Sequence, residues 1–221
     1  MASKADTARA LVAGYGRTFA REAGIRLRDT PAPLFRLLGL SALLSARIPA
    51  DTAVSAARAL AGAGWTTPAK MQAATWRQRT DTLNAAGYAR YDESTARMLG
   101  DATDLLVERY GGDLRRLRDQ GGGRTDDLRR LLTEFKGIGD VGADIFLREV
   151  QGVWSEVLPF ADRRVLEVAR QLGLGDGARA LRRLVDSDAD YVKLSAALVR
   201  VGLARGTPGE VVGQLVAGST A

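Results

Sequence analysis

The chain has 221 residues and a formal net charge of +6, and it contains neither cysteine nor histidine. The absence of both residue types excludes disulfides, thiolate zinc sites, cysteine-ligated iron–sulfur clusters and every Ser-His-Asp or Cys-His catalytic arrangement. Acid–base chemistry must therefore come from Asp, Glu, Lys and Tyr, and the basic charge favours a polyanionic partner such as nucleic acid.

Apolar residues recur at helical spacing along almost the whole chain, and no segment shows the sustained period-two alternation of a β-strand. The sequence therefore predicts an all-α fold. Glycines and prolines separate the predicted helices. These helices are expected near residues 5–23, 33–47, 51–62, 68–74, 78–87, 93–110, 124–135, 141–151, 163–172, 178–186, 190–203 and 209–216.

No apolar stretch reaches the roughly 20 residues that span a bilayer, and the N-terminal segment is charged and amphipathic instead of resembling a signal peptide. We therefore expect a cytoplasmic protein that makes no membrane contact.

The most informative motif is Lys136-Gly137-Ile138-Gly139, which joins two apolar helices within residues 131–147. Two glycines at this spacing permit a tight turn and let backbone amides approach a phosphate, and the positive N-terminus of the next helix adds to that attraction. Asp140 would repel a phosphate, whereas Lys136 partly offsets it. The alternative interpretation is an ordinary corner between two helices; in either case we expect Ile138 to enter the core.

Several motifs, in a fixed order, resemble those of the helix-hairpin-helix DNA glycosylase superfamily, the group of endonuclease III, adenine glycosylase and the alkylpurine glycosylases. Residues 43–47 (Leu-Leu-Ser-Ala-Arg) are similar to the family's Leu-Leu-Ser-Ala-Gln helix end, and residues 110–112 (Tyr-Gly-Gly) to its Tyr/His-x-Gly. Residues 158–162 (Leu-Pro-Phe-Ala-Asp) are similar to the approach to its catalytic aspartate. The resemblance covers roughly residues 33–203.

This resemblance implies two helical lobes with a DNA-binding cleft between them. One lobe would consist of the chain ends, residues 1–32 and 163–221. The other would be a central lobe, residues 33–162, that carries the helix-hairpin-helix at 131–147 and the loop of the catalytic aspartate.

Asp162 matches the family's catalytic aspartate, which would stabilise an oxocarbenium-like sugar and orient or activate water. An Asp at this position would also serve as the N-cap of the helix at 163–172, and the two roles are compatible. Val141 stands where bifunctional members carry a Schiff-base lysine, so the resemblance implies an enzyme without lysine-dependent lyase activity.

The resemblance also implies a set of DNA contacts. Arg47 stands where the family inserts a glutamine to fill the gap left by an extruded nucleotide, although a solvated arginine at a helix end is the alternative. Arg163 and Arg164 replace the family's Thr-His and would either pair with Asp162 or clamp a phosphate. The expected hairpin contacts are Lys136, Gly137, Ile138, Gly139, Val141 and Gly142.

Two aromatic residues are candidates for lining a base pocket, Tyr91 and Trp154. For Trp154 the alternative is a buried core position, which is the commoner environment of a tryptophan.

We expect a monofunctional DNA glycosylase that removes an alkylated or deaminated base from duplex DNA during base excision repair. An alkylated base is favoured, because residues 158–162 resemble the aromatic-Pro-x-Asp approach of the alkylpurine branch. Adenine glycosylases carry a glutamate on the corresponding helix, whereas this chain has small and apolar residues around Ser41. The resemblance therefore argues against adenine removal.

We expect a cluster-free monomer with no cofactor and no catalytic metal, associated with the nucleoid when bound to DNA. A structural monovalent or divalent cation at the hairpin backbone is compatible with the sequence. Two alternatives stay open: a catalytically inactive DNA-structure-binding protein with the same fold, suggested by Asp140, Val141 and the Arg163-Arg164 pair, and a helical protein-interaction module.

Overall fold

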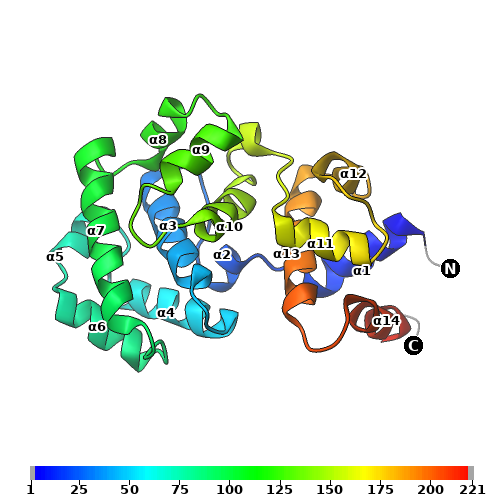
Figure 1. The fold of residues 1–221 in the computed structure, drawn as a ribbon, viewed down its shortest axis with the longest axis horizontal. Coiled ribbons are helices and arrows are strands. Elements are labelled where there is room, and N and C mark those ends of the chain that lie inside the picture. The colour runs from blue at the N-terminus through cyan, green and yellow to red at the C-terminus, as the bar shows by residue number, and fades with distance from the viewer. Residues whose placement is uncertain (1–2, 219–221) are drawn as a thin grey trace. The chain divides into compact units, whose positions relative to one another are not determined.

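The computed structural model describes residues 3–218, except for the side chains of residues 214 and 216–218. This part of the chain consists of helices joined by turns and loops, without a strand, which confirms the predicted all-α fold (Figure 1). Among these residues, no helix is both long and apolar enough to span a bilayer. The helices are α1 (Lys4–Tyr15), α2 (Phe19–Glu22), α3 (Pro31–Ser45), α4 (Ala50–Gly62), α5 (Pro68–Ala73), α6 (Trp76–Ala85), α7 (Asp92–Tyr110), α8 (Leu114–Gln120), α9 (Thr125–Leu132), α10 (Asp140–Val150), the 3-10 turn η1 (Ser155–Val157), α11 (Arg163–Gln171), α12 (Ala178–Arg182), α13 (Asp188–Leu203) and α14 (Pro208–Gly218).

The chain forms two compact units. The central unit is Ala20–Glu156, and the terminal unit combines Met1–Phe19 with Val157–Ala221. The expected boundaries after residue 32 and before residue 163 differ from these, because residues 20–32 lie in the central unit and residues 157–162 lie in the terminal unit.

Hydrogen bonds explain the first of these boundaries. The Ala20 amide donates to Glu149 Oε2 at 2.9 Å, and Arg58 Nε donates to the Glu22 carbonyl at 2.8 Å. Glu149 and Arg58 belong to the central unit, so these bonds tie α2 from Ala20 onward to that unit.

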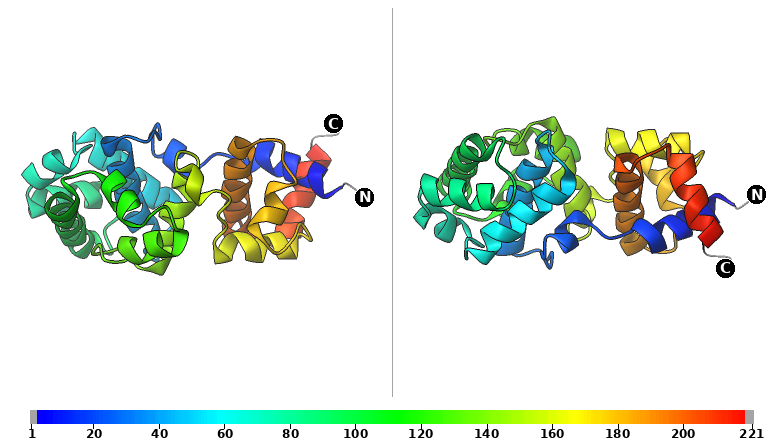
Figure 2. Two further views of the ribbon diagram at one scale, coloured as in Figure 1. Left: turned by 90° about the horizontal axis from the view of Figure 1, so that it is seen from above. Right: turned by 90° about the horizontal axis from the view of Figure 1, so that it is seen from below.

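Helix α3 is the core helix of the central unit. It begins at Pro31 and buries the apolar residues Leu34, Phe35, Leu37, Leu38, Leu40 and Leu43. Because these residues lie on nearly all sides of the helix, α3 must be covered all round. It packs against α4 and α10, while α5 and α6 pack against α7 (Figures 1 and 2).

Helix α13 has the same role in the terminal unit, where it packs against α1, α11 and α14 (Figure 2). The helix predicted at residues 5–23 is divided into α1 and α2, which corrects that prediction. Gly16 ends α1, and Arg200 Nε of α13 donates to the Arg17 carbonyl at 2.8 Å. This carbonyl is therefore bonded to a side chain from another part of the chain instead of to a helical amide.

The structure also contains α8, a short helix that the sequence analysis did not predict. Asp113 caps its N-terminus by accepting a hydrogen bond from the Arg115 amide at 3.0 Å, and Leu114 and Leu117 are buried. With only seven residues, α8 is too short to show a helical period clearly.

Candidate active site and nucleic-acid interface

The hairpin between α9 and α10 is a tight turn built around Gly137. This glycine has φ +82°, which an L-residue rarely adopts, and a Cβ added to it would lie 3.1 Å from Cβ of Met98 in α7. Ile138 is 3% exposed, which confirms the expectation that it enters the core. Gly139 is the N-cap of α10 and has open space around its Cα.

The predicted hairpin contacts differ in accessibility. Lys136 and Gly139 are exposed, and Val141 is 62% exposed in the first turn of α10. Gly142 is buried, and a Cβ there would meet Ile138 and Ser45 at 3.4–3.6 Å. Its small size therefore serves the contact of α10 with the hairpin and α3.

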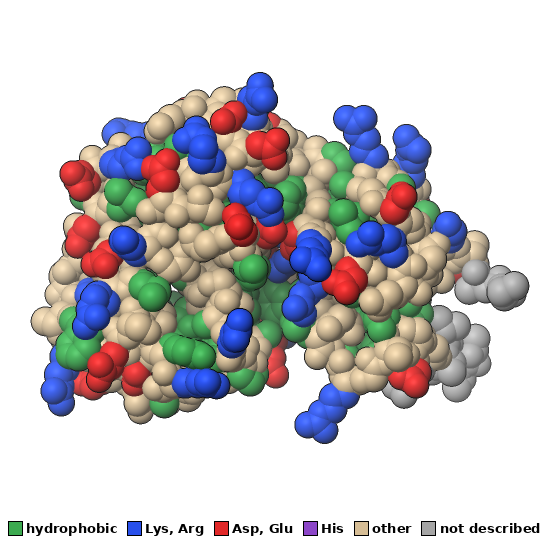
Figure 3. All heavy atoms as spheres, viewed as in Figure 1, with side chains coloured by type: hydrophobic (Ala, Val, Ile, Leu, Met, Phe, Trp, Pro, Cys, Tyr) green, Lys and Arg blue, Asp and Glu red, His purple; other side chains and the backbone are tan. Residues whose placement is uncertain are grey.

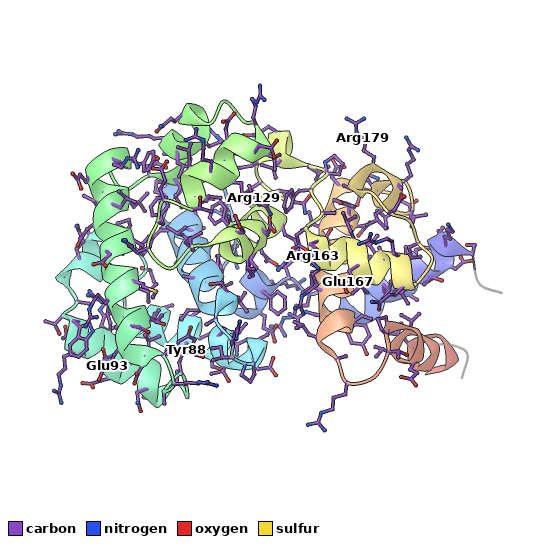
Figure 4. The ribbon with its side chains drawn as sticks, in the orientation of Figure 1. Tyr88, Glu93, Arg129, Arg163, Glu167 and Arg179 are labelled. Atoms are coloured by element: carbon purple, nitrogen blue, oxygen red, sulfur yellow. The ribbon has the colours of Figure 1, made fainter. Side chains whose placement is uncertain are left out.

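An ion pair joins the two helices of the hairpin. Arg129 of α9, which Figure 4 labels, pairs with Asp144 of α10. Asp140 lies exposed in the first turn of α10, where its negative charge interacts favourably with the helix dipole.

Arg47 follows the C-terminal end of α3. The helix ends at Ser45 with Ala46 as its C-cap, and Arg47 is exposed and forms no ion pair with any residue that the structure describes. This environment leaves the guanidinium accessible to solvent and to a ligand.

A hollow of about 510 Å³ lies beside the hairpin, within the central unit. We call it the hairpin pocket. Its walls are the C-terminal end of α3, the N-terminal half of α7 with the two tyrosines that precede this helix, and the hairpin segment 133–139. Tyr91, one of the residues expected to line a pocket, lines this one, and so does Tyr88, which the sequence analysis did not single out.

Trp154, the other expected pocket residue, is a core residue. Its side chain is 0% exposed, its indole N–H donates to Asp29 Oδ1 at 2.9 Å, and Phe146 packs edge-on against it. The expectation that Trp154 lines a pocket was wrong, because Asp29, distant in the sequence, supplies the partner that its N–H needs when buried.

Asp162 lies in the terminal unit, at the start of α11. Its Oδ1 accepts a hydrogen bond from the Val165 amide at 2.9 Å, which confirms the N-cap role expected from the sequence. The residue is 5% exposed. Two residues earlier, the Phe160 carbonyl accepts a hydrogen bond from the hydroxyl of Tyr191 in α13 at 2.9 Å.

Tyr191 is a further residue that sequence reasoning missed. It is 0% exposed, and burial together with the negative charge of Asp162 raises the pKa of its hydroxyl to about 12, against an opposing effect of Ser195. The hydroxyl therefore stays protonated and remains a donor at physiological pH.

Arg163 and Arg164 occupy the first turn of α11, and both are exposed. Neither forms an ion pair with a residue in the described part of the chain. Figure 4 shows Arg163 and Glu167 one turn apart on α11, with Arg179 of α12 directed away from the terminal unit. Positive side chains at a helix N-terminus are unfavourable by themselves, so an anionic ligand would stabilise this arrangement.

No family model matches the sequence, and no curated protein matches it. Solved structures do match the fold, and two of them are complexes of endonuclease III with DNA. A trapped endonuclease III–DNA covalent intermediate, an estranged-adenine complex, has 16% identity and a TM-score of 0.50, and a non-covalent endonuclease III–DNA complex has 15% identity and a TM-score of 0.53. In each comparison the match covers 90% of this chain and 85% of the other.

The chain has the endonuclease III fold. The resemblance to helix-hairpin-helix glycosylases is thereby confirmed at the level of the fold. Within this fold, the hairpin, Arg47 and Tyr91 belong to the central unit, whereas Asp162, Arg163 and Arg164 belong to the terminal unit.

Proposed function

We propose that this protein is a monofunctional DNA glycosylase that hydrolyses the N-glycosidic bond of a damaged base in duplex DNA. The observation that carries the proposal is a carboxylate, Asp162, held at the start of α11 in a chain with the endonuclease III fold. Both matching structures are described as endonuclease III with DNA, which supports DNA as the ligand.

In this proposal Asp162 acts on the sugar of the damaged nucleotide. The bond between C1′ and the base nitrogen breaks, the electron pair leaves with the base, and the carboxylate stabilises the positive charge that develops on the sugar. A water oxygen then bonds to C1′, and its proton passes to the carboxylate. The Val165 amide, which bonds Oδ1, fixes the orientation of the carboxylate. The reaction requires no cofactor.

The absence of lyase activity follows from Val141. A valine side chain has no amine that could attack C1′ as a Schiff-base nucleophile, so the abasic strand would stay intact. Lys136, the nearest lysine in the sequence, lies on the exposed hairpin turn, where we assign it to a phosphate.

The DNA contacts would come from both units. The amides of Gly137 and Gly139 and the N-terminus of α10 would bind a phosphate, with the ammonium group of Lys136 beside it. Arg163 and Arg164 would clamp phosphates, and Arg47 would enter the duplex. An alkylated base is the favoured substrate, because a positively charged base needs less help to leave.

The test is base release from duplexes that carry alkylated, deaminated or oxidised bases, before and after heating in alkali. Asp162→Asn removes the charge but keeps an N-cap, because Asn caps helices as well as Asp does. The matched control is Asp113→Asn at the N-cap of α8. We expect wild type and the control to release base, Asp162→Asn to release none, and strands to break only after alkali.

A second candidate is a catalytically inactive protein that binds DNA structures. Asp162 is already engaged as an N-cap and is 5% exposed, and two arginines follow it directly. Duplex binding that survives Asp162→Asn, without base release from any substrate, would favour this candidate over the glycosylase.

A further inference from the structure

The thioether of Met98 is the accessible sulfur of the described structure. The chain has no cysteine and three methionines. Met98, in α7, is 40% exposed, whereas Met71, in α5, is 3% exposed, and Met1 lies outside the described residues. Because the oxidation of a methionine depends on its exposure, an oxidant that reaches this part of the chain should react at Met98 first.

Met98 also borders an open hollow. It lines the hairpin pocket, whose volume of about 510 Å³ admits a molecule as small as hydrogen peroxide. Figure 3 shows apolar side chains around hollows on this face of the central unit. The side chain of Met98 is therefore held where an oxidant can approach it from solvent.

The same side chain supports the hairpin turn. A Cβ built on Gly137 would lie 3.2 Å from Sδ of Met98 and 3.1 Å from its Cβ, so Met98 occupies the space beside this glycine and packs against it. Gly137 is followed by the buried Ile138 and by Gly139, the N-cap of α10. A shift at Gly137 would therefore also move the amides that we assign to a phosphate.

We propose that Met98 is a site of reversible oxidation whose sulfoxide loosens the hairpin and lowers its affinity for DNA. The DNA-binding step of this inference rests on the proposed function. With hydrogen peroxide, an S–O bond forms at Sδ and the O–O bond breaks; the sulfur is oxidised, and the other oxygen leaves with both hydrogens as water. The new polar oxygen sits on the atom that packs against Gly137. The Cα of Gly137 offers it no hydrogen bond, so the contact weakens.

A methionine sulfoxide reductase reverses this step. Two thiols supply two electrons and two protons and become a disulfide, while the oxygen of the sulfoxide leaves as water. The thioether is regenerated, and the apolar contact with Gly137 can form again.

The experiment treats the full chain with hydrogen peroxide. Peptide mass mapping measures the oxidation of each methionine, urea unfolding gives the midpoint, and a binding titration gives the dissociation constant for a paired duplex. Met98→Leu keeps an apolar side chain without sulfur, and Met98→Gln places a polar side chain of similar length at the same position. Met71→Leu is the matched control at the buried methionine.

We expect the sulfoxide of Met98 to form before that of Met71 and to lower the urea midpoint. The dissociation constant should rise by about 5-fold, the low end of the cost of a polar group in an apolar contact. The reductase should restore both values. Met98→Leu should keep its affinity in peroxide, Met98→Gln should bind duplex more weakly than Met98→Leu without peroxide, and Met71→Leu should respond to peroxide as wild type does.

Oxidation of Met71 before Met98 overturns the proposal, and so does complete oxidation of Met98 that leaves the dissociation constant unchanged. Loss of affinity in peroxide-treated Met98→Leu also overturns it, because the damage then lies at another group, such as the exposed Trp76. Untreated wild type that binds no duplex overturns the proposed function and the DNA-binding step together. In that case the peptide map and the urea midpoint still decide whether oxidation of Met98 loosens the hairpin.

Discussion

The hydroxyl of Tyr191 and the carbonyl of Phe160 are joined by a hydrogen bond of 2.9 Å. This bond attaches the segment that leads into Asp162 to the buried helix α13, at a tyrosine that has no exposed surface. The position of the proposed catalytic carboxylate therefore depends on a residue 29 positions further along the chain.

Replacing Tyr191 with Phe should remove this attachment while keeping the ring in the core. The Phe160 carbonyl would lose its donor, so we expect the free energy of unfolding to fall by about 1–2 kcal/mol. Under the proposed function, the rate of base release should fall roughly 10-fold because a displaced carboxylate no longer meets the sugar correctly. Single-turnover assays and urea unfolding measure the two effects.

Tyr110→Phe is the matched control for that variant. Tyr110 is 2% exposed, and its hydroxyl is buried without a hydrogen-bond partner among the described residues. Removing this hydroxyl should leave stability and base release unchanged, or raise stability slightly. Equal effects of the two substitutions would contradict the anchoring role of Tyr191.

Alkaline pH should weaken the fold through Tyr191. The pKa of its hydroxyl is about 12 in the fold, compared with an ordinary value of 10.0, so between these pH values the unfolded chain loses a proton that the folded chain retains. The stabilisation of the fold that is linked to the raised pKa of Tyr191 is complete below pH 10 and is lost as the pH rises toward 12. The loss amounts to about 2–3 kcal/mol of the free energy of unfolding. Urea unfolding across this range should show a steeper decline for wild type than for Tyr191→Phe; parallel curves would disprove the assignment.

Alanine substitutions at the two hairpin glycines should separate folding from DNA binding. Gly137→Ala places a Cβ 3.1 Å from Met98 at φ +82°, so it should cost about 1–2 kcal/mol of stability and also weaken duplex binding. Gly139 has φ −91° and open space, so Gly139→Ala should fold normally. If the Gly139 amide meets a phosphate, Gly139→Ala should still bind duplex less tightly; wild-type affinity would remove this amide from the interface.

Arg79 should matter for stability far more than its neighbour Arg77. The Arg79 guanidinium is buried and donates to the carbonyls of Ala96 at 2.9 Å and Ala74 at 2.6 Å. Arg79→Met would strand these carbonyls and should cost about 2–4 kcal/mol. Arg77 is exposed, and its only ion pair in the described structure is a long contact with Asp81, so Arg77→Met should change stability by less than about 0.5 kcal/mol. Thermal unfolding of the two variants makes the comparison, and similar losses would refute it.

Only part of the hairpin pocket could be predicted from the sequence, because its walls come from segments that are far apart in the chain. Tyr91 was singled out in the sequence, but the pocket that it lines also needs the end of α3 and the segment 133–139. Helical periodicity gave no indication that Tyr88 would lie beside them, because its hydrogen-bond partner Leu43 is 45 residues away.

The sequence by itself determined the all-α class, the hairpin turn at Gly137, the burial of Ile138 and the N-cap role of Asp162. Each depends on residues a few positions apart, through helical period, backbone dihedral angles or a cap, and such short-range terms can be read from the chain. The tertiary structure decided that Trp154 is a core residue, that α1 ends at Tyr15, and that Tyr191 holds the approach to Asp162. Each outcome depends on a hydrogen bond to a distant partner. Trp154 bonds Asp29, 125 residues away, Arg200 bonds Arg17, 183 residues away, and Tyr191 bonds Phe160, 31 residues away. A buried polar group takes the partner that folding brings to it, and local sequence carries no record of that choice.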